Sequence, residues 1–461
     1  MKIYVSGLKP IYTMGIIAVY FLVCQLVSPL EYIFPTLLMC ILIFLGCTFI
    51  YDSNYNILCI RNLFFLLLYV LGFYLRYILI IANDSRTLAF GATYAARSIS
   101  PSNHTKTILC ILLFTVAFII GGSKTKNKNP LVKITSDNRP INSIMVIIYI
   151  VFTVVYTIYA FLNTRLATVQ DFGIYDNLFN NIAYFNRFIA YIYLISYSRD
   201  KRKKHLCLYL LFILPYVGAT LVSLYKGTAL LEVLIFLAVM SRGRRIRPKA
   251  IILLLLVFLI IFPVISMLRI NESLPGSYQM NLSGISKYYS TNNPIEYLSR
   301  RFQYYDETYF IINTDPAEMT QFREKINNPL VAFFTGIIPR VIWHNKPKGN
   351  FAYLVTHELL KIPSVFITNV TIGEVAESYI YGGIILIIFL GLFHGFLLRR
   401  NDEIIEDNDS PMAYACYLVI GNLLISFAEG LVIGKITILI TLLIIVAVLK
   451  SMQNSGKYEA F

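Results

Sequence analysis

Charge is scarce in this sequence. Only 14% of the 461 residues are Asp, Glu, Lys or Arg, whereas 57% are hydrophobic. A soluble globular domain carries about 25% charged residues, because its surface must face water. The shortage of charge therefore excludes a chain whose main solvent is water.

Acidic residues are scarcer than basic ones, with 25 Asp and Glu against 40 Lys and Arg. A basic excess can indicate a nucleic-acid partner, but here many of the cations lie in short clusters between apolar runs. These clusters fall at 124–139, 199–204, 242–249 and 399–400. Cytoplasmic loops of membrane proteins have this distribution. We therefore expect membrane lipids around the chain and no nucleic acid.

Cysteine is missing from the long polar segment 269–371, which we call the long segment. The chain has seven cysteines, namely Cys24, Cys40, Cys47, Cys59, Cys110, Cys207 and Cys416. Their spacing matches neither a disulfide framework nor a zinc site. We expect no metal and no other cofactor.

Hydrophobic residues form uninterrupted runs of about 17 to 25, the length that an α-helix needs to cross a bilayer. They do not alternate with polar residues as in a membrane β-barrel. The first run follows a short basic end without a clear cleavage site, so we interpret it as a retained helix. The runs predict about twelve transmembrane helices, near 11–30, 33–50, 62–82, 107–122, 141–162, 178–197, 206–224, 227–240, 250–268, 372–398, 411–428 and 431–449.

An even number of crossings with basic loops inside places both termini in the cytoplasm. The sequence thus predicts an all-α integral membrane protein. Helices 1–9 occupy residues 1–268, and a large extracytoplasmic loop, which the resemblance described below makes periplasmic in the bacterial inner membrane, occupies 269–371. Helices 10–12 and a cytoplasmic tail follow in 372–461. Within the loop, Pro294–Thr314 resembles short amphipathic helices that lie on a membrane surface.

The long segment carries more arginine than a periplasmic loop should. Arginine's planar fork suits phosphate oxygens, so this excess suggests an anionic ligand such as a pyrophosphate. Pairing with lipid headgroups or with Asp306, Glu307 and Glu318 is the alternative. The cations are Arg269, Arg300, Arg301, Arg323 and Arg340, followed by His344, Lys346 and Lys348.

Aromatic residues also gather in the long segment. The run 338–347 combines two prolines, two cations, His344 and Trp343, the only tryptophan. Trp343 could stack on a sugar ring or anchor the loop at headgroup level. Tyr304 and Tyr305 are further candidates for contacts with sugars.

Two carboxylates stand three residues apart where the tenth helix begins. Glu374 and Glu377 share one helical face, so either could act as a general base. Alternatively, both simply complement the helix macrodipole. Farther along this helix, Gly391 and Gly395 allow close packing against another helix.

Ionisable residues inside predicted transmembrane helices are costly and should face the interior of the bundle. Arg76, Arg187 and Glu429 are of this kind. Each could form an internal ion pair, extend to the interface or contact a ligand.

Together these residues resemble the bacterial O-antigen polymerase (Wzy-type) family. The resemblance rests on the twelve-helix architecture, on Ile338-Pro-Arg-Val-Ile-Trp-His-Asn-Lys-Pro347, and on Gly373-Glu374 with Tyr381-Gly382-Gly383 at the entry to the next helix. It implies metal-independent transfer of a growing glycan from undecaprenyl pyrophosphate to the next lipid-linked repeat unit. A chain-length regulator would be a possible partner.

The resemblance also implies roles for single residues. Arg300 or Arg301 and Arg340 would hold the pyrophosphate, with Lys346 nearby. Glu374, Glu377 or His344 would be the base. Lys226 stands where relatives often have an arginine, and lysine lacks the bidentate fork.

Two other functions compete with polymerisation. A lipid-linked oligosaccharide flippase would also have about twelve helices and intramembrane charges, but it usually divides into two similar halves. An O-antigen ligase shares the architecture and tends to carry a histidine before the helix entry, where this chain has Asn369-Val370-Thr371-Ile372.

Overall fold

The computed structural model describes residues 9–27, 30–52, 66–83, 100–122, 174–222, 282–291, 304–326, 351–361, 372–406 and 411–427, with scattered positions within 150–154, 232–240, 267 and 435–443. Every regular element among them is helical, which confirms the all-α prediction for this part of the chain. The chain divides into two compact units. The first comprises Met1–Asn127, Leu298–Asp402 and Gly421–Thr437, and the remaining residues form the second.

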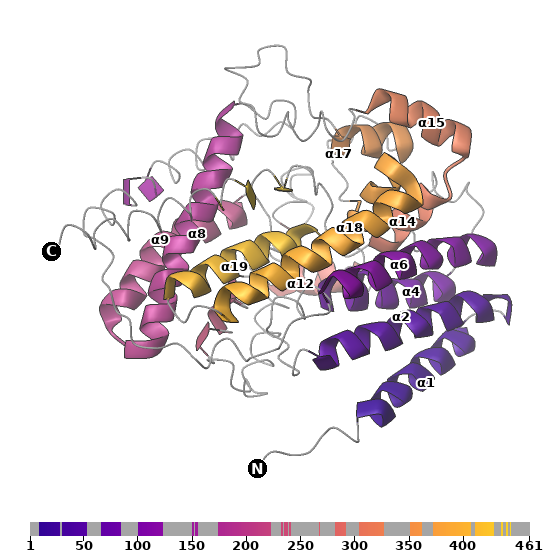
Figure 1. Ribbon diagram of the computed structural model, residues 1–461, viewed down its shortest axis with the longest axis horizontal. Coiled ribbons are helices and arrows are strands. Elements are labelled where there is room, and N and C mark those ends of the chain that lie inside the picture. The colour runs from indigo at the N-terminus through magenta and orange to yellow at the C-terminus, as the bar shows by residue number, and fades with distance from the viewer. Residues whose placement is uncertain are drawn as a thin grey trace. The chain divides into compact units, whose positions relative to one another are not determined.

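The N-terminal helices of the first unit follow the predicted apolar runs (Figure 1). They are α1 (Lys9–Val27), the short turn η1 (Leu30–Tyr32), α2 (Ile33–Asp52), η2 (Leu66–Leu75) continuing as α4 (Arg76–Asn83), and α6 (Pro101–Gly122). Helix α6 begins six residues before the apolar run at 107, because local capping starts it. The Ser100 hydroxyl accepts the Asn103 N–H at 3.2 Å, and Pro101 takes the first helical position.

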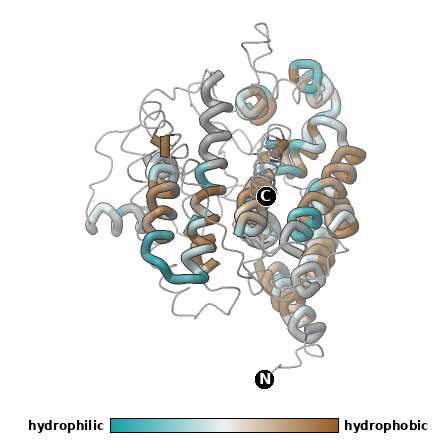
Figure 2. The backbone as a smooth tube through the Cα atoms, turned by 60° about the vertical axis from the view of Figure 1, so that its left-hand side comes forward, coloured by the Kyte–Doolittle hydropathy of each residue, from teal (hydrophilic) through white to brown (hydrophobic). Residues whose placement is uncertain are grey.

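Three helices in the described residues are long and apolar enough to cross a membrane: Leu30–Thr48, Pro101–Gly122 and Glu374–Glu403. Shorter apolar helices cover Thr13–Val27, Gly72–Ile81 and Pro411–Ser426. Large hydrophobic side chains project outward from α1, with Leu26 85% exposed, and brown stretches mark these helices in Figure 2. This apolar exterior is that of a membrane protein. The runs predicted near 141–162, 227–240, 250–268 and 431–449 fall mainly outside the described residues.

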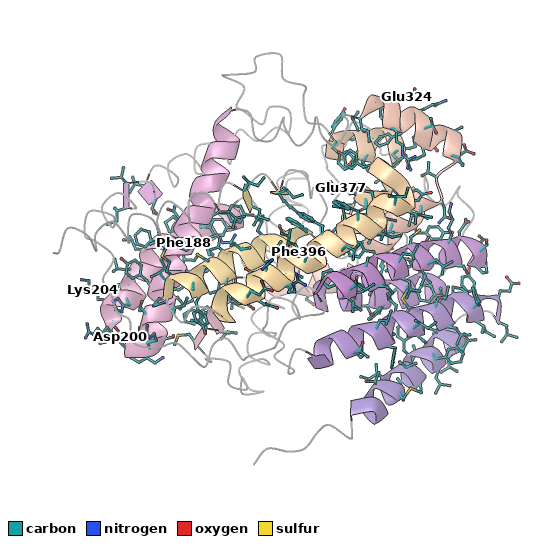
Figure 3. All side chains as sticks on the ribbon, viewed as in Figure 1. Phe188, Asp200, Lys204, Glu324, Glu377 and Phe396 are labelled. Atoms are coloured by element: carbon teal, nitrogen blue, oxygen red, sulfur yellow. The ribbon has the colours of Figure 1, made fainter. Side chains whose placement is uncertain are left out.

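A helical hairpin forms the described core of the second unit. Helices α8 (Ile174–Asp200) and α9 (Lys203–Val222) pack along each other, as predicted for 178–197 and 206–224. Asp200 fixes the turn, since its carboxylate accepts the Arg202 N–H at 3.0 Å and lies 3.1 Å from Nδ1 of His205. Figure 2 shows this turn as hydrophilic, and Figure 3 places Asp200 and Lys204 there.

The long segment contributes short helices. They are α12 (Leu282–Thr291) in the second unit, and α14 (Tyr304–Ile312), α15 (Pro316–Lys325), α17 (Phe351–Leu354) and η5 (Val355–Leu359) in the first. Contrary to prediction, α14 is not an amphipathic helix on a surface. All of its residues are buried, and it packs against η2, α4 and α6. Its charged residues are buried with it, which a hydrophobic pattern does not reveal.

The tenth predicted helix, 372–398, is also not continuous. Helix α18 (Glu374–Glu406) is interrupted at Gly382 (φ −153°, ψ 16°) and Gly383 (φ 61°, ψ −147°), and the conformation of Gly383 is accessible almost only to glycine. We call 374–381 the first limb and 384–406 the second limb. The last described helix, α19 (Pro411–Ser426), follows the predicted run 411–428.

Candidate functional site

Most of the site residues predicted from the sequence lie outside the described residues. These are Lys226, Arg300, Arg301, Arg340, Trp343, His344 and Lys346. Glu374, Glu377, Tyr304 and Tyr305 are described, and all four are buried. The structure therefore describes the surroundings of two of the predicted bases, Glu374 and Glu377, while the third base, His344, and the pyrophosphate clamps stay predictions.

Glu374 lies against a histidine that the sequence analysis did not select. Its Oε2 is 2.7 Å from Nδ1 of His394, although the two residues are 20 positions apart in α18. In a straight helix they would be separated by about 30 Å. The break at Gly382–Gly383 therefore turns the first limb back along the second, and Figure 3 labels Glu377 and Phe396 on the two limbs.

One oxygen of Glu374 remains available. The carboxylate is fully buried, yet its Oε1 has no hydrogen-bond partner within the described part of the protein. A buried carboxylate oxygen without a donor is costly, so such groups usually have a function. Here one oxygen binds the imidazole and the other can accept a proton from a further group.

Aromatic rings enclose His394. The ring of Phe118 in α6 meets the imidazole edge-on, with centroids 5.4 Å apart, and Phe427 lies 5.2 Å away. His394 itself is 1% exposed. The imidazole and the carboxylate therefore interact in surroundings of low polarity, where a hydrogen bond between them is strengthened.

Glycines allow α6 and the second limb of α18 to approach closely. A Cβ atom at Gly395 would lie 2.1 Å from the Phe118 carbonyl oxygen, and one at Gly391 would lie 2.7 Å from that of Phe114. On α6, a Cβ at Gly121 would lie 2.2 Å from the Leu392 oxygen. This confirms the predicted close packing, and it brings His394 against Phe118.

The first limb of α18 holds both predicted carboxylates in its first turn. Gly373 precedes it with φ 72°, a value that favours glycine, and its carbonyl accepts the Glu377 N–H at 3.1 Å. The helix N-terminus favours negative charge at Glu374 and Glu377, as the macrodipole alternative predicted. That alternative does not account for the His394 contact, so Glu374 has more than a capping role.

At its other end, the first limb meets Arg323 of α15. The Nε–H of Arg323 donates to the Ile380 carbonyl at 2.6 Å, and a second guanidinium nitrogen donates to the Tyr379 carbonyl at 2.8 Å. The ring of Tyr381 stacks on Phe351 with centroids 4.9 Å apart. Arg323, one of the cations assigned from sequence to an anionic ligand, here binds backbone carbonyls.

A second buried charge pair ties α14 into the helices. Arg76 in α4 donates from Nε to Oδ1 of Asp306 at 2.7 Å and from a terminal nitrogen to Oδ2 at 2.5 Å. Both side chains are almost completely buried. Of the roles considered for Arg76, an internal ion pair is therefore the one that the structure supports.

The tyrosines assigned to sugar contacts belong to the same interior. The Tyr305 hydroxyl lies 2.6 Å from Nδ1 of His104, and its ring packs against Tyr77 and Tyr309. Burial raises the pKa of Tyr305 well above its usual range, so the phenol keeps its proton. Tyr304 is 5% exposed and Tyr305 is fully buried, because α14 is inserted among the helices. Their assignment as substrate contacts stays a prediction.

The second unit contains its own buried charge pair. Arg187 in α8 pairs with Glu232 at 2.6 Å, and the Tyr191 hydroxyl donates to the other Glu232 oxygen at 2.7 Å. The rings of Tyr184 and Tyr216 lie 5.3 and 4.8 Å from the guanidinium. Arg187 is thus an internal ion pair as well, with aromatic faces that stabilise its charge.

Comparisons with known proteins leave these geometries as the main guide to function. No protein-family model, no curated protein and no solved structure matches the chain. Among the described residues no group of three or more His, Cys, Asp or Glu side chains could hold a metal ion. The chemistry at hand is that of a carboxylate and an imidazole beside a helix break.

Proposed function

We propose that the protein is a surface-polysaccharide polymerase. It transfers a growing glycan from undecaprenyl pyrophosphate to the non-reducing end of another lipid-linked repeat unit at the periplasmic face of the bacterial inner membrane. In this proposal about twelve helices cross the membrane, both termini are cytoplasmic, and the long segment between helices 9 and 10 is periplasmic. The proposal extends the family resemblance given above.

The observation that carries the proposal is the buried Glu374 carboxylate, which has one oxygen on His394 and the other without a donor among the described residues. An acceptor hydroxyl on the sugar must lose its proton as it attacks the anomeric carbon. Oε1 of Glu374 accepts that proton, and Oε2 stays bound to His394. General base catalysis of this kind contributes about 10²- to 10⁴-fold to a rate.

The bonds balance without a metal or a redox partner. A new C–O bond forms between the acceptor oxygen and the anomeric carbon, while the bond from that carbon to the pyrophosphate oxygen breaks. The lipid pyrophosphate leaves with the electron pair, and its charge requires cations. Arg300, Arg301 and Arg340 are proposed for that role, with Trp343 and Lys346 as sugar and phosphate contacts, Lys226 as a further cation and His344 as an alternative base.

The test is the pattern of surface glycans in a host that makes the cognate polysaccharide. Deletion of the gene should leave a core bearing a single repeat, and the wild-type gene should restore the ladder. Glu374→Gln should not restore it, although the protein inserts normally. Glu324→Gln makes the same chemical change at an exposed position of α15 and should restore it fully.

Each assignment has its own result. Failure of Arg301→Ala and Arg340→Ala to restore the ladder supports the anion clamp, whereas full rescue by both removes that assignment and leaves the function. Full rescue by Glu374→Gln rules out Glu374 as the base. In that case, Glu377→Gln tests whether Glu377, the other carboxylate of the first limb, is the base.

A transporter is the second candidate, and the break in α18 is the observation that favours it. Discontinuous helices with buried ionisable residues line the substrate sites of many secondary transporters. A lipid-linked oligosaccharide flippase would supply the repeat units themselves. Its deletion would remove every repeat, including the single one, so the same gel separates the two functions. Deletion of an O-antigen ligase would also remove every repeat from the core, but lipid-linked polymer would then accumulate at the periplasmic face of the inner membrane.

A further inference from the structure

Among the described residues of the long segment, Arg323 donates two hydrogen bonds from its guanidinium to the first limb of α18. A helix leaves its last four carbonyls without intrahelical donors. The break at Gly382 ends the first limb, so the Tyr379 and Ile380 carbonyls need donors from elsewhere. The planar guanidinium supplies both from two nitrogens held in a rigid fork, a geometry that the compact ammonium of a lysine lacks.

The helix that carries Arg323 is itself tethered. Asp315 caps the N-terminus of α15 by accepting the Ala317 N–H at 2.8 Å, and Pro316 follows at the first helical position. Met319 and Phe322 of the same helix are buried. The Arg323 contact is therefore made from a supported position, and it links the long segment to α18.

Two polar contacts, one near each end, hold the short helix of the first limb. Glu374 at one end contacts His394, and Arg323 binds the carbonyls about one and a half turns away. Packing also holds the first limb, since residues 375–378 are buried. Loss of the Arg323 contact therefore lets the limb pivot slightly about the two glycines within that packing. A pivot would change the distance between the carboxylate and the imidazole.

We infer that Arg323 is a positioning residue, which holds the first limb of α18 so that Glu374 stays on His394. The inference rests on the proposed function for its catalytic consequence, because the contact matters to the rate only if Glu374 is the base. The long segment then serves the site in two ways. It provides the proposed substrate cations, and through α15 it sets the geometry of the base.

The experiment compares Arg323→Met, Arg323→Lys and Glu324→Gln with wild type, each purified in lipid nanodiscs. Methionine keeps the length and apolar stem of the side chain without a donor, and lysine retains the charge and one hydrogen bond. Glu324 is the neighbouring exposed residue and serves as the control. Protein labelled with ¹⁵N-histidine, with His394→Gln to assign the signal, reports the His394 ring during a pH titration.

We expect the His394 ring resonances to move in Arg323→Met, to move less in Arg323→Lys and to stay in place in Glu324→Gln. The polymerisation rate should fall about 100-fold in the methionine variant and about tenfold in the lysine variant, because small misplacements of a catalytic group are that costly. The pH–rate profile should shift with the His394 titration. A merely structural loss would lower the amount of folded protein without moving that profile.

Unchanged His394 resonances in both Arg323 variants would overturn the inference, whatever the rates. The lysine variant keeps this test available if the methionine variant does not fold. If His394 responds as expected but the wild-type protein polymerises nothing, the positioning role stands and the proposed function fails. The two failures are therefore distinguishable.

Discussion

Two buried charge pairs in the first unit differ in what they leave unsatisfied. Arg76 and Asp306 meet through two parallel hydrogen bonds, so that each carboxylate oxygen has a donor. Glu374 meets His394 through one oxygen only, and the other has no donor among the described residues. The first pair is complete and can only hold structure, whereas the second can take part in a reaction.

The chemical nature of the two partners, a guanidinium and an imidazole, supports the same distinction between the pairs. A guanidinium stays protonated at every physiological pH, so the Asp306 carboxylate stays beside a fixed positive charge. An imidazole can gain or lose a proton near neutrality. A carboxylate that is bound to an imidazole and has one oxygen without a donor can accept a proton, and this is the property that a catalytic base needs.

The largest expected effect is on the reaction. Glu374→Gln should lower the polymerisation rate by about 10²- to 10⁴-fold, because the amide cannot accept a proton. The amide oxygen can still accept a hydrogen bond from His394, so thermal unfolding in detergent should change little. The rate is measured with lipid-linked repeat units in proteoliposomes. If Glu374→Gln also lowered the unfolding temperature in proportion to its loss of rate, the distinction between a catalytic pair and a structural pair would be contradicted.

The next effect is on stability. Arg76→Met leaves the Asp306 carboxylate buried without its partner, and loss of one member of a buried pair costs about 3–5 kcal/mol. The unfolding midpoint and the yield of monodisperse protein should both drop. The double variant Arg76→Met/Asp306→Leu should recover most of that loss, because apolar replacements of similar volume are often neutral. A double variant as unstable as the single one would show that the pair does more than hold α14.

Most of the helices could be predicted from the sequence, because crossing a bilayer imposes an apolar run of a known length. The ranges of α1, α2 and α9 differ from the predictions by only a few residues. The start of α6 was missed, since Ser100 and Pro101 begin the helix in polar sequence. Burial of α14 was missed because its Asp306 is compensated by Arg76, 230 residues away.

The candidate site was predictable in part. Two acids at a helix start indicated Glu374 and Glu377, but their partner stands alone in the apolar sequence of the second limb. A histidine at the centre of such a run is itself a signal, because ionisable residues in membrane helices are costly. That Glu374 reaches His394 depends on the backbone at Gly382–Gly383, and two adjacent glycines permit a reversal without requiring one.

A smaller effect is expected from the packing that brings His394 to Phe118. Gly395→Ala places a methyl group 2.1 Å from the Phe118 carbonyl oxygen, so α6 and α18 must move apart. Overpacking of this kind costs about 1–3 kcal/mol, and the rate should fall with the displacement of His394. Gly218→Ala in α9 is the control, since nothing lies within 4 Å of its added methyl group. Equal unfolding temperatures for the two variants would mean that the close approach is not required.

The smallest effect concerns a third charge pair, which shows whether the distance between the charges or their burial determines the stabilisation. Lys325 and Glu358 are 2.5 Å apart, as close as Arg76 and Asp306, but their side chains are 59% and 35% exposed. Water and salt screen an exposed pair, so Lys325→Met should cost less than about 1 kcal/mol. A double-mutant cycle with Glu358→Gln, measured by thermal unfolding at low and high salt, gives the coupling energy. A coupling as large as that of the buried pair would mean that short distance alone stabilises these contacts. A coupling that fades with salt means that burial is what makes removal of one member of the Arg76–Asp306 pair costly.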